Sequence, residues 1–196
     1  MILRALILSG LLGASAAFAQ SPVDMRDLAR ISNYLNATET LRGEFVQVDP
    51  DSVVAEGEFS MRRPGRIRFE YDPPNTALVV ADGFWVAVID RADGGVDRYP
   101  LNDTPLSLLL KEDVDLRREG WVRAIDRSDG QLAVTARDPE APDQGDITLI
   151  FSENPLELRQ WVVRDAQGRA TTVALRDVRV NVPVEAAEFV IRDPER

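Results

Sequence analysis

The sequence predicts a mainly β protein of the α+β class, built as one antiparallel domain. Residues 66–71, RIRFEY, alternate charged and apolar side chains, which is the period of a strand with one wet face and one buried face. Turns that contain glycine, at residues 93–95, 129–130 and 167–168, separate further short apolar or alternating runs. Glycine supplies the positive φ that tight hairpins need, so these turns predict antiparallel neighbours.

The first residues predict export. Residues 1–19 carry one positive charge at Arg4, then an apolar run, and end in Ala17-Phe18-Ala19, which is the pattern of a cleaved secretory signal peptide. The apolar run is shorter than the ~20 residues that span a bilayer, so a retained membrane helix is the weaker alternative. We expect a signal peptide at residues 1–19 and one mature domain at residues 20–196.

The composition excludes most catalytic designs. The chain has no histidine and no cysteine, which removes the usual general base, the common zinc ligand, the thiol nucleophile and any disulfide. Its 33 acidic and 23 basic residues give a net charge of −10, so nucleic acid would be repelled. A carboxylate pair acting in a hydrolase stays open as an alternative.

Helix and strand signals follow one another along the chain. Ser21-Pro22 opens a helix that we expect to run to about Thr40, and Gly43 ends it. Its single apolar stripe is expected to consist of Met25, Leu28, Ile31 and Leu35. Residues 138–145, with two prolines, are expected to form a loop. The expected strands cover residues 45–48, 53–61, 66–71, 77–81, 84–89, 121–126, 131–137, 146–151, 158–164, 171–180 and 188–191, mostly as an antiparallel meander.

Residues 62–90 organise the expected sheet. The turn Asp72-Pro73-Pro74-Asn75 stops one strand, because proline offers no donor to the sheet. Residues 77–81 and 84–89 are apolar at nearly every position, so both faces of these strands should be covered. This pattern indicates either the ordinary core of an antiparallel domain or a lined cavity.

Residues 104–111, TPLSLLLK, interrupt the strand pattern. A threonine and a proline open a short helix with four leucines, which cannot face water. Two interpretations stay open: a core helix at one end of the sheet, or a lid above it.

Several short motifs stand in a fixed order along the chain. They are Phe45-x-Gln47, Gly57-x-Phe59, Arg63-Pro64-Gly65, Phe69-Glu70-Tyr71, Pro74, Ala81-Asp82-Gly83, Tyr99-Pro100-Leu101, Thr104-Pro105-Leu106 and the closing Phe189-x-Ile191 and Pro194. Each motif alone is weak, but together they resemble the LolA family, the periplasmic outer-membrane lipoprotein carriers, over essentially the whole mature chain.

The resemblance implies a fold and a function. The fold is a single incomplete, strongly curved antiparallel β-barrel with a helical lid over an apolar cavity. The function is that of a periplasmic chaperone without enzyme activity, cofactor or metal, which binds the acyl chains of lipoproteins as a monomer. Its implied partners are an inner-membrane ABC-type lipoprotein-releasing complex and an outer-membrane acceptor. A periplasmic carrier or sensor of another lipid is the alternative.

The resemblance also assigns site residues. Arg63 matches the family's lid-closing arginine, and its guanidinium offers five donors in a fixed fork. The alternative is a surface arginine beside a turn, like Arg62 and Arg66. The acyl-chain cavity is expected to be lined by Phe45, Phe59, Ile67, Phe69, Tyr71, Leu106, Leu109 and Leu110.

Overall fold

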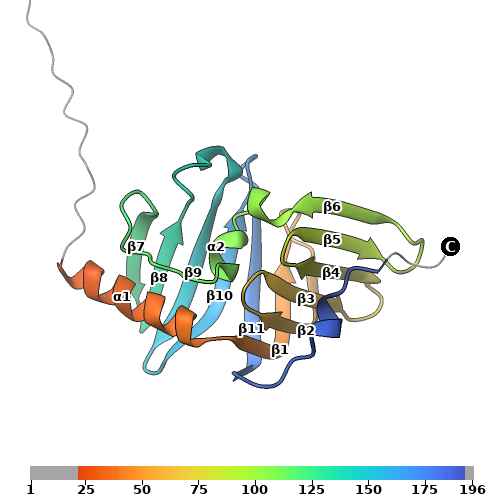
Figure 1. The fold of residues 1–196 in the computed structure, drawn as a ribbon, viewed down its shortest axis with the longest axis horizontal. Helices are drawn as coiled ribbons and strands as arrows, with labels where there is room; N and C mark the ends of the chain where they lie inside the picture. Colours follow the sequence, from red (N-terminus) through yellow and green to blue (C-terminus); the bar gives the residue numbers. More distant parts are fainter. Residues whose placement is uncertain (1–21, 193–196) are drawn as a thin grey trace, which may run out of the picture.

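A single antiparallel sheet forms the centre of the computed structural model, which describes residues 22–192 (Figure 1). The first half of the sheet consists of β1 (Thr40–Val48), β2 (Val54–Arg62), β3 (Arg66–Tyr71), β4 (Ala77–Asp82), β5 (Trp85–Asp90) and β6 (Val96–Pro100). The second half consists of β7 (Val122–Ser128), β8 (Gln131–Ala136), β9 (Asp146–Glu153), β10 (Leu156–Arg164) and β11 (Ala170–Val180). The predicted mainly β, antiparallel class is confirmed.

The sheet is two meanders joined in the middle. The strand order is β6-β5-β4-β3-β2-β1-β11-β10-β9-β8-β7, so the expected meander holds within each half and β1 pairs with β11 between them. The sheet does not close, because β6 and β7 stay as its two edges. Figure 1 draws β7–β10 nearly upright and β3–β6 nearly horizontal, which shows how strongly the sheet curves.

The concave side of the sheet carries the helices. α1 (Pro22–Ala37) crosses the second half at β7–β10, and α2 (Ser107–Leu110) lies within the segment that links the two edges, β6 and β7 (Figure 1). Their buried side chains join those of the sheet in one hydrophobic cluster. Three 3₁₀ helices complete the described chain: η1 (Leu101–Asp103), η2 (Pro142–Gln144) and η3 (Ala186–Phe189).

The predicted end of the first helix is wrong. α1 ends at Ala37, and Gly43 lies inside β1. A Cβ on Gly43 would come within 2.6 Å of the carbonyl oxygen of Arg176 on β11. This glycine therefore permits close approach of two strands at an irregularity in their pairing, and the helix ends without it.

Two further boundaries differ from the sequence-based expectation. The expected strand at residues 188–191 is instead η3, whose Phe189 packs with Val80 and Val184 on the convex side of the sheet. The expected helix at residues 104–111 is shortened to α2, because Thr104 follows the 3₁₀ turn η1 and its hydroxyl donates back to the Leu101 carbonyl at 2.8 Å. The edge strand β6 was not predicted.

The apolar run at residues 84–89 is only partly covered. Phe84 is 81% exposed and Val88 is 38% exposed, so the expectation of two buried faces is wrong at these positions. The expectation holds better for β4, where Ala81 lies in the main cluster and Val80 faces η3. The expected signal peptide, Ser21 and Pro194 lie outside the described residues. No helix within residues 22–192 is long and apolar enough to cross a membrane.

Candidate functional site

Aromatic side chains gather on the concave face of β1–β3. The Phe45 ring lies edge-on to Phe69 and to Tyr71, with centroids 5.0 and 5.1 Å apart, and Phe59 stacks on Phe69 at 6.2 Å. Trp161 reaches the same cluster from β10, at 6.1 Å from Phe69. Such pairs stabilise their packing by about 0.5–1.5 kcal/mol beyond the area they bury. The first half of the sheet therefore presents an aromatic wall.

The hydroxyl of Tyr71 is the polar group of this wall. It donates to Gln47 Oε1 at 2.8 Å, which connects two of the sequence motifs across β2. Burial raises the pKa of Tyr71, and the hydrogen bond to Gln47 opposes that rise. Because the hydroxyl has its partner, the wall is apolar toward the helices.

The remaining predicted cavity residues lie in the same cluster. Ile67 and Leu109 are fully buried, Leu110 is 1% exposed, and Leu106 is half-buried at the edge of the cluster. The structure thus brings all eight predicted cavity residues into one cluster, five on β1–β3 and three in or next to α2. In this form their own side chains fill the space, so a guest molecule needs α1 or α2 to move.

α1 covers the aliphatic second half of the sheet. Leu28, Ile31 and Leu35 form its buried stripe, whereas Met25, which was expected in the same stripe, is 37% exposed. Tyr34 packs edge-on to Phe151 of β9 at 5.7 Å, and its hydroxyl accepts a hydrogen bond from the Leu158 amide at 3.2 Å. The middle of the helix therefore rests on apolar contacts, to which Tyr34 adds a polar contact with β10.

Arg63 joins both helices to the corner between β2 and β3. Its Nη1 donates to the Leu35 carbonyl near the end of α1, while Nε (3.0 Å) and Nη2 donate to the Lys111 carbonyl just after α2. The backbone beside it adds a further bond, from the Gly65 amide to the Leu110 carbonyl at 2.9 Å. One guanidinium fork thus holds main-chain carbonyls from two helices at once.

Burial has the largest effect on the pKa of Arg63. Loss of solvent lowers the pKa of this guanidinium, and the nearby charge of Asp113 acts in the opposite direction. Asn36 reinforces the same junction: its amide donates to Asp113 at 3.1 Å and to the Val114 carbonyl at 3.0 Å, and accepts from the Val114 amide at 2.9 Å. The end of α1 and the segment after α2 are therefore held as one unit.

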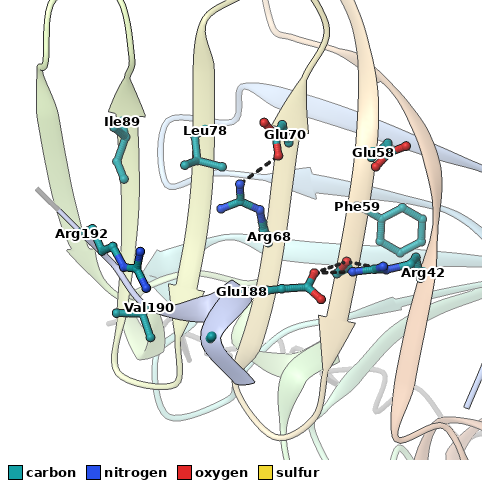
Figure 2. Close-up of a pocket in the computed structure, with 12 residues that line it drawn as sticks. Arg42, Glu58, Phe59, Arg68, Glu70, Leu78, Ile89, Glu188, Val190 and Arg192 are labelled. Atoms are coloured by element: carbon teal, nitrogen blue, oxygen red, sulfur yellow. Dashed lines mark hydrogen bonds and ion pairs between the residues drawn. The ribbon is translucent and has the colours of Figure 1, made fainter. Parts of the chain in front are cut away.

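A hollow of about 580 Å³ on the convex side has a different character (Figure 2). Its floor carries paired charges: Arg42 meets Glu188 from η3, and Arg68 donates to Glu70 at 2.9 Å. A long apolar chain bound here would remove these charged side chains from water and offer them no hydrogen bonds in return, which is unfavourable. The concave cluster is therefore the better candidate for an apolar ligand.

Residues 36–192 match the protein family described as outer membrane lipoprotein carrier protein LolA. The chain belongs to the LolA family. It is 28% identical to an outer-membrane lipoprotein carrier protein of Azotobacter vinelandii, over 94% of each chain. It is 31% identical to one of Chromohalobacter salexigens, over 72% of this chain and 68% of that one. A solved LolA superfamily protein from Nitrosomonas europaea aligns over 85% of this chain and 97% of its own, at 8% identity and a TM-score of 0.44.

Two contributors to this LolA-family site were missed in the sequence. Trp161 was placed on a strand, but the irregular pairing between Leu158 and Gln160 shifts the alternation, so its face was not readable. The sequence around Asn36 contains no signal for its role, because its hydrogen-bond partners lie 77 and 78 residues away. Within residues 22–192 no group of three or more potential metal-ligating side chains comes together.

Proposed function

We propose that this member of the LolA family is a periplasmic carrier that shelters the acyl chains of lipoproteins between its concave face and its two helices. One observation carries the proposal: a buried aromatic wall lies beneath two helices that Arg63 joins to each other and to the sheet. The family description and the names of the curated relatives support lipoproteins as the cargo class. Carriage of this kind needs binding and release, and no bond-making chemistry.

The free energy of acyl-chain burial explains why the form without cargo is closed. Transfer of an acyl chain of roughly 15 methylenes at ~0.8 kcal/mol each would release about 12 kcal/mol, enough for nanomolar binding. Opening the helices exposes Leu28, Ile31 and the wall residues, which offsets part of that gain. The offset keeps the cargo releasable, and the closing helices help to expel it.

The free energy needed to remove acyl chains from a membrane points to the partners of this chain. Extraction of a lipoprotein from the inner membrane needs an energy source, and the chain has no Gly-x-x-x-x-Gly-Lys motif for a nucleotide. We assign that step to an inner-membrane ABC-type releasing complex and the final step to an outer-membrane acceptor. Export through residues 1–19 as a signal peptide and a periplasmic location of residues 20–196 belong to this proposal.

Mass spectrometry of the protein purified from periplasm tests the cargo class. Diacylglyceryl or triacyl lipopeptides should co-purify with the intact chain. Consistent recovery of another lipid alone would favour the alternative, a carrier of a different lipophilic ligand.

A buried charge tests the wall. Ile67→Glu places a carboxylate in the cluster and should reduce cargo uptake at least tenfold. Leu106→Glu, at a half-buried position, is the milder variant in case the first does not fold. Val54→Glu is the matched control, because Val54 is 65% exposed on β2. Normal uptake by both folded wall variants would refute the site.

A further inference from the structure

The end of α1 that lies far from Arg63 is held to the sheet by charge. Arg127 of β7 donates from Nη1 and Nη2 to Asp24 Oδ1, each at 3.1 Å, and from Nε to Asp27 Oδ2 at 3.1 Å. Arg30 donates to the other oxygen of Asp27 at 3.0 Å. The cluster formed by Asp24, Asp27, Arg30 and Arg127 joins the first turns of α1 to an edge strand 100 residues away.

Asp27 is the buried member of this cluster, at 8% exposure. Burial alone raises the pKa of Asp27, but the hydrogen bonds from Arg127 and Arg30 outweigh it and hold the pKa below its ordinary value. A buried carboxylate that loses its partners is strongly unfavourable. Arg127 therefore fixes where this end of the helix lies.

The opposite end of α1 is fixed by the chain itself. α1 ends at Ala37 and β1 begins at Thr40. Asn181 holds the connection, since its amide donates to the Ala37 carbonyl at 2.9 Å and its Oδ1 accepts from the Glu39 amide at 2.8 Å. If α1 leaves the sheet, it pivots near residues 38–39 and its first turn travels furthest.

The two arginines act at different distances from that pivot. With a rise of 1.5 Å per residue, Leu35, the acceptor of Arg63, lies about 5 Å from residue 38, whereas Asp24 lies about 20 Å away. A bond near a pivot opposes rotation weakly, and one at the far end opposes it strongly. Arg63 therefore controls the junction of α1 with the α2 segment, and Arg127 controls the swing of α1.

We propose that Arg127 is a second positioning residue of the lid: α1 opens as a lever about residues 38–39, on the side of β7, and the charge cluster sets how readily it opens. The link to cargo entry rests on the proposed function, while the pivot and the cluster do not depend on it. The opening then lies between the first turns of α1 and the β7 edge of the sheet.

Spin-label distances in the empty protein test the proposal. The chain has no cysteine, so Arg26→Cys and Gln131→Cys provide two unique labelling sites, one exposed on α1 and one exposed beside β7. We expect one narrow distance distribution for the parent, and a longer population that grows about tenfold or more in Arg127→Met. Arg123→Met, an exposed arginine on the same strand, is the charge-matched control and should leave the distribution unchanged.

Two outcomes overturn the proposal. One is an unchanged distribution in folded Arg127→Met, and the other is an equal change in Arg123→Met. If Arg127→Met does not fold, Asp24→Asn serves as the test variant, because it leaves the hydrogen bonds of Asp27 in place. It should give a smaller increase of the long-distance population. No cargo is present in this experiment. A negative result would therefore refute the lever without bearing on the proposed function, and a failure of cargo uptake would not refute the lever.

Discussion

The two ends of α1 are fastened by the same side-chain type against different acceptors. Arg63 donates to main-chain carbonyls, which have no titratable proton and carry only partial charge. Arg127 donates to the carboxylates of Asp24 and Asp27, which titrate and carry full charge. The first turns of α1 should therefore respond to pH and salt more strongly than its junction with the α2 segment.

Arg63→Leu should have the largest effect. It removes charge-assisted hydrogen bonds worth on the order of 1.5 to 3 kcal/mol each from the closed form, and adds apolar surface beside the wall. We expect the variant to accept lipoprotein and to deliver it at least tenfold less well. The measurement scores release from spheroplasts and delivery to outer membranes separately.

Two variants control this prediction. Arg66→Leu removes the same charge from the same corner and should deliver normally. Arg63→Lys should recover part of the loss, because a point charge cannot hold several carbonyls as the fork does. Equal loss in both steps would make Arg63 merely structural, and normal delivery would remove its role in closure.

Acidification should release the first turns of α1 from β7 and leave the junction at Arg63 closed. The pKa of Asp27 is depressed in the folded protein, so its stabilisation is complete above the ordinary carboxyl pKa of about 4 and is lost as pH falls through the lowered value. Spin labels at residues 26 and 131 should gain a long-distance population as the pH falls below the ordinary carboxyl value of about 4. Labels at residues 39 and 112, both exposed beside Arg63, should keep their distance until the whole protein unfolds. Simultaneous change at both pairs would abolish the distinction.

Salt should give the smallest effect. Arg127 is about a third exposed, at 34%, so ions can screen its pairs. The screening length shortens from about 10 Å at 0.1 M to about 3 Å at 1 M. We expect the open population seen by the first label pair to rise a few-fold across that range, with no change at the second pair. A fall in the open population with salt would contradict the charge-based account.

Part of the candidate site was predictable. The alternation of Ile67, Phe69 and Tyr71 determines which side chains share a face, and the helical spacing of Leu28, Ile31 and Leu35 determines the buried stripe of α1. The corner at Arg63 came from its match to a family motif. The structure places the apolar residues in one hydrophobic cluster and Arg63 on the carbonyls of Leu35 and Lys111, and their action on acyl chains stays a prediction.

The errors arise where tertiary contacts override the local sequence pattern. Gly43 was taken for a helix end, although its function is to let β1 approach β11, and Glu188 was placed on a strand although the burial of Phe189 selects a 3₁₀ turn. Phe84 was expected to be covered, yet it is 81% exposed. In each case a tertiary contact, or its absence, overrode the local pattern.

Periodicity and composition were enough to predict the antiparallel class, most strands, most of the buried stripe of α1 and the exclusion of histidine and cysteine chemistry. Three contacts are visible only in the folded molecule: β1 pairs with β11, Arg63 meets Leu35 and Lys111, and Arg127 meets Asp24 and Asp27. These partners are 28 to 139 residues apart. Local pattern carries no signal over such separations, whereas the curvature of the sheet brings them into contact.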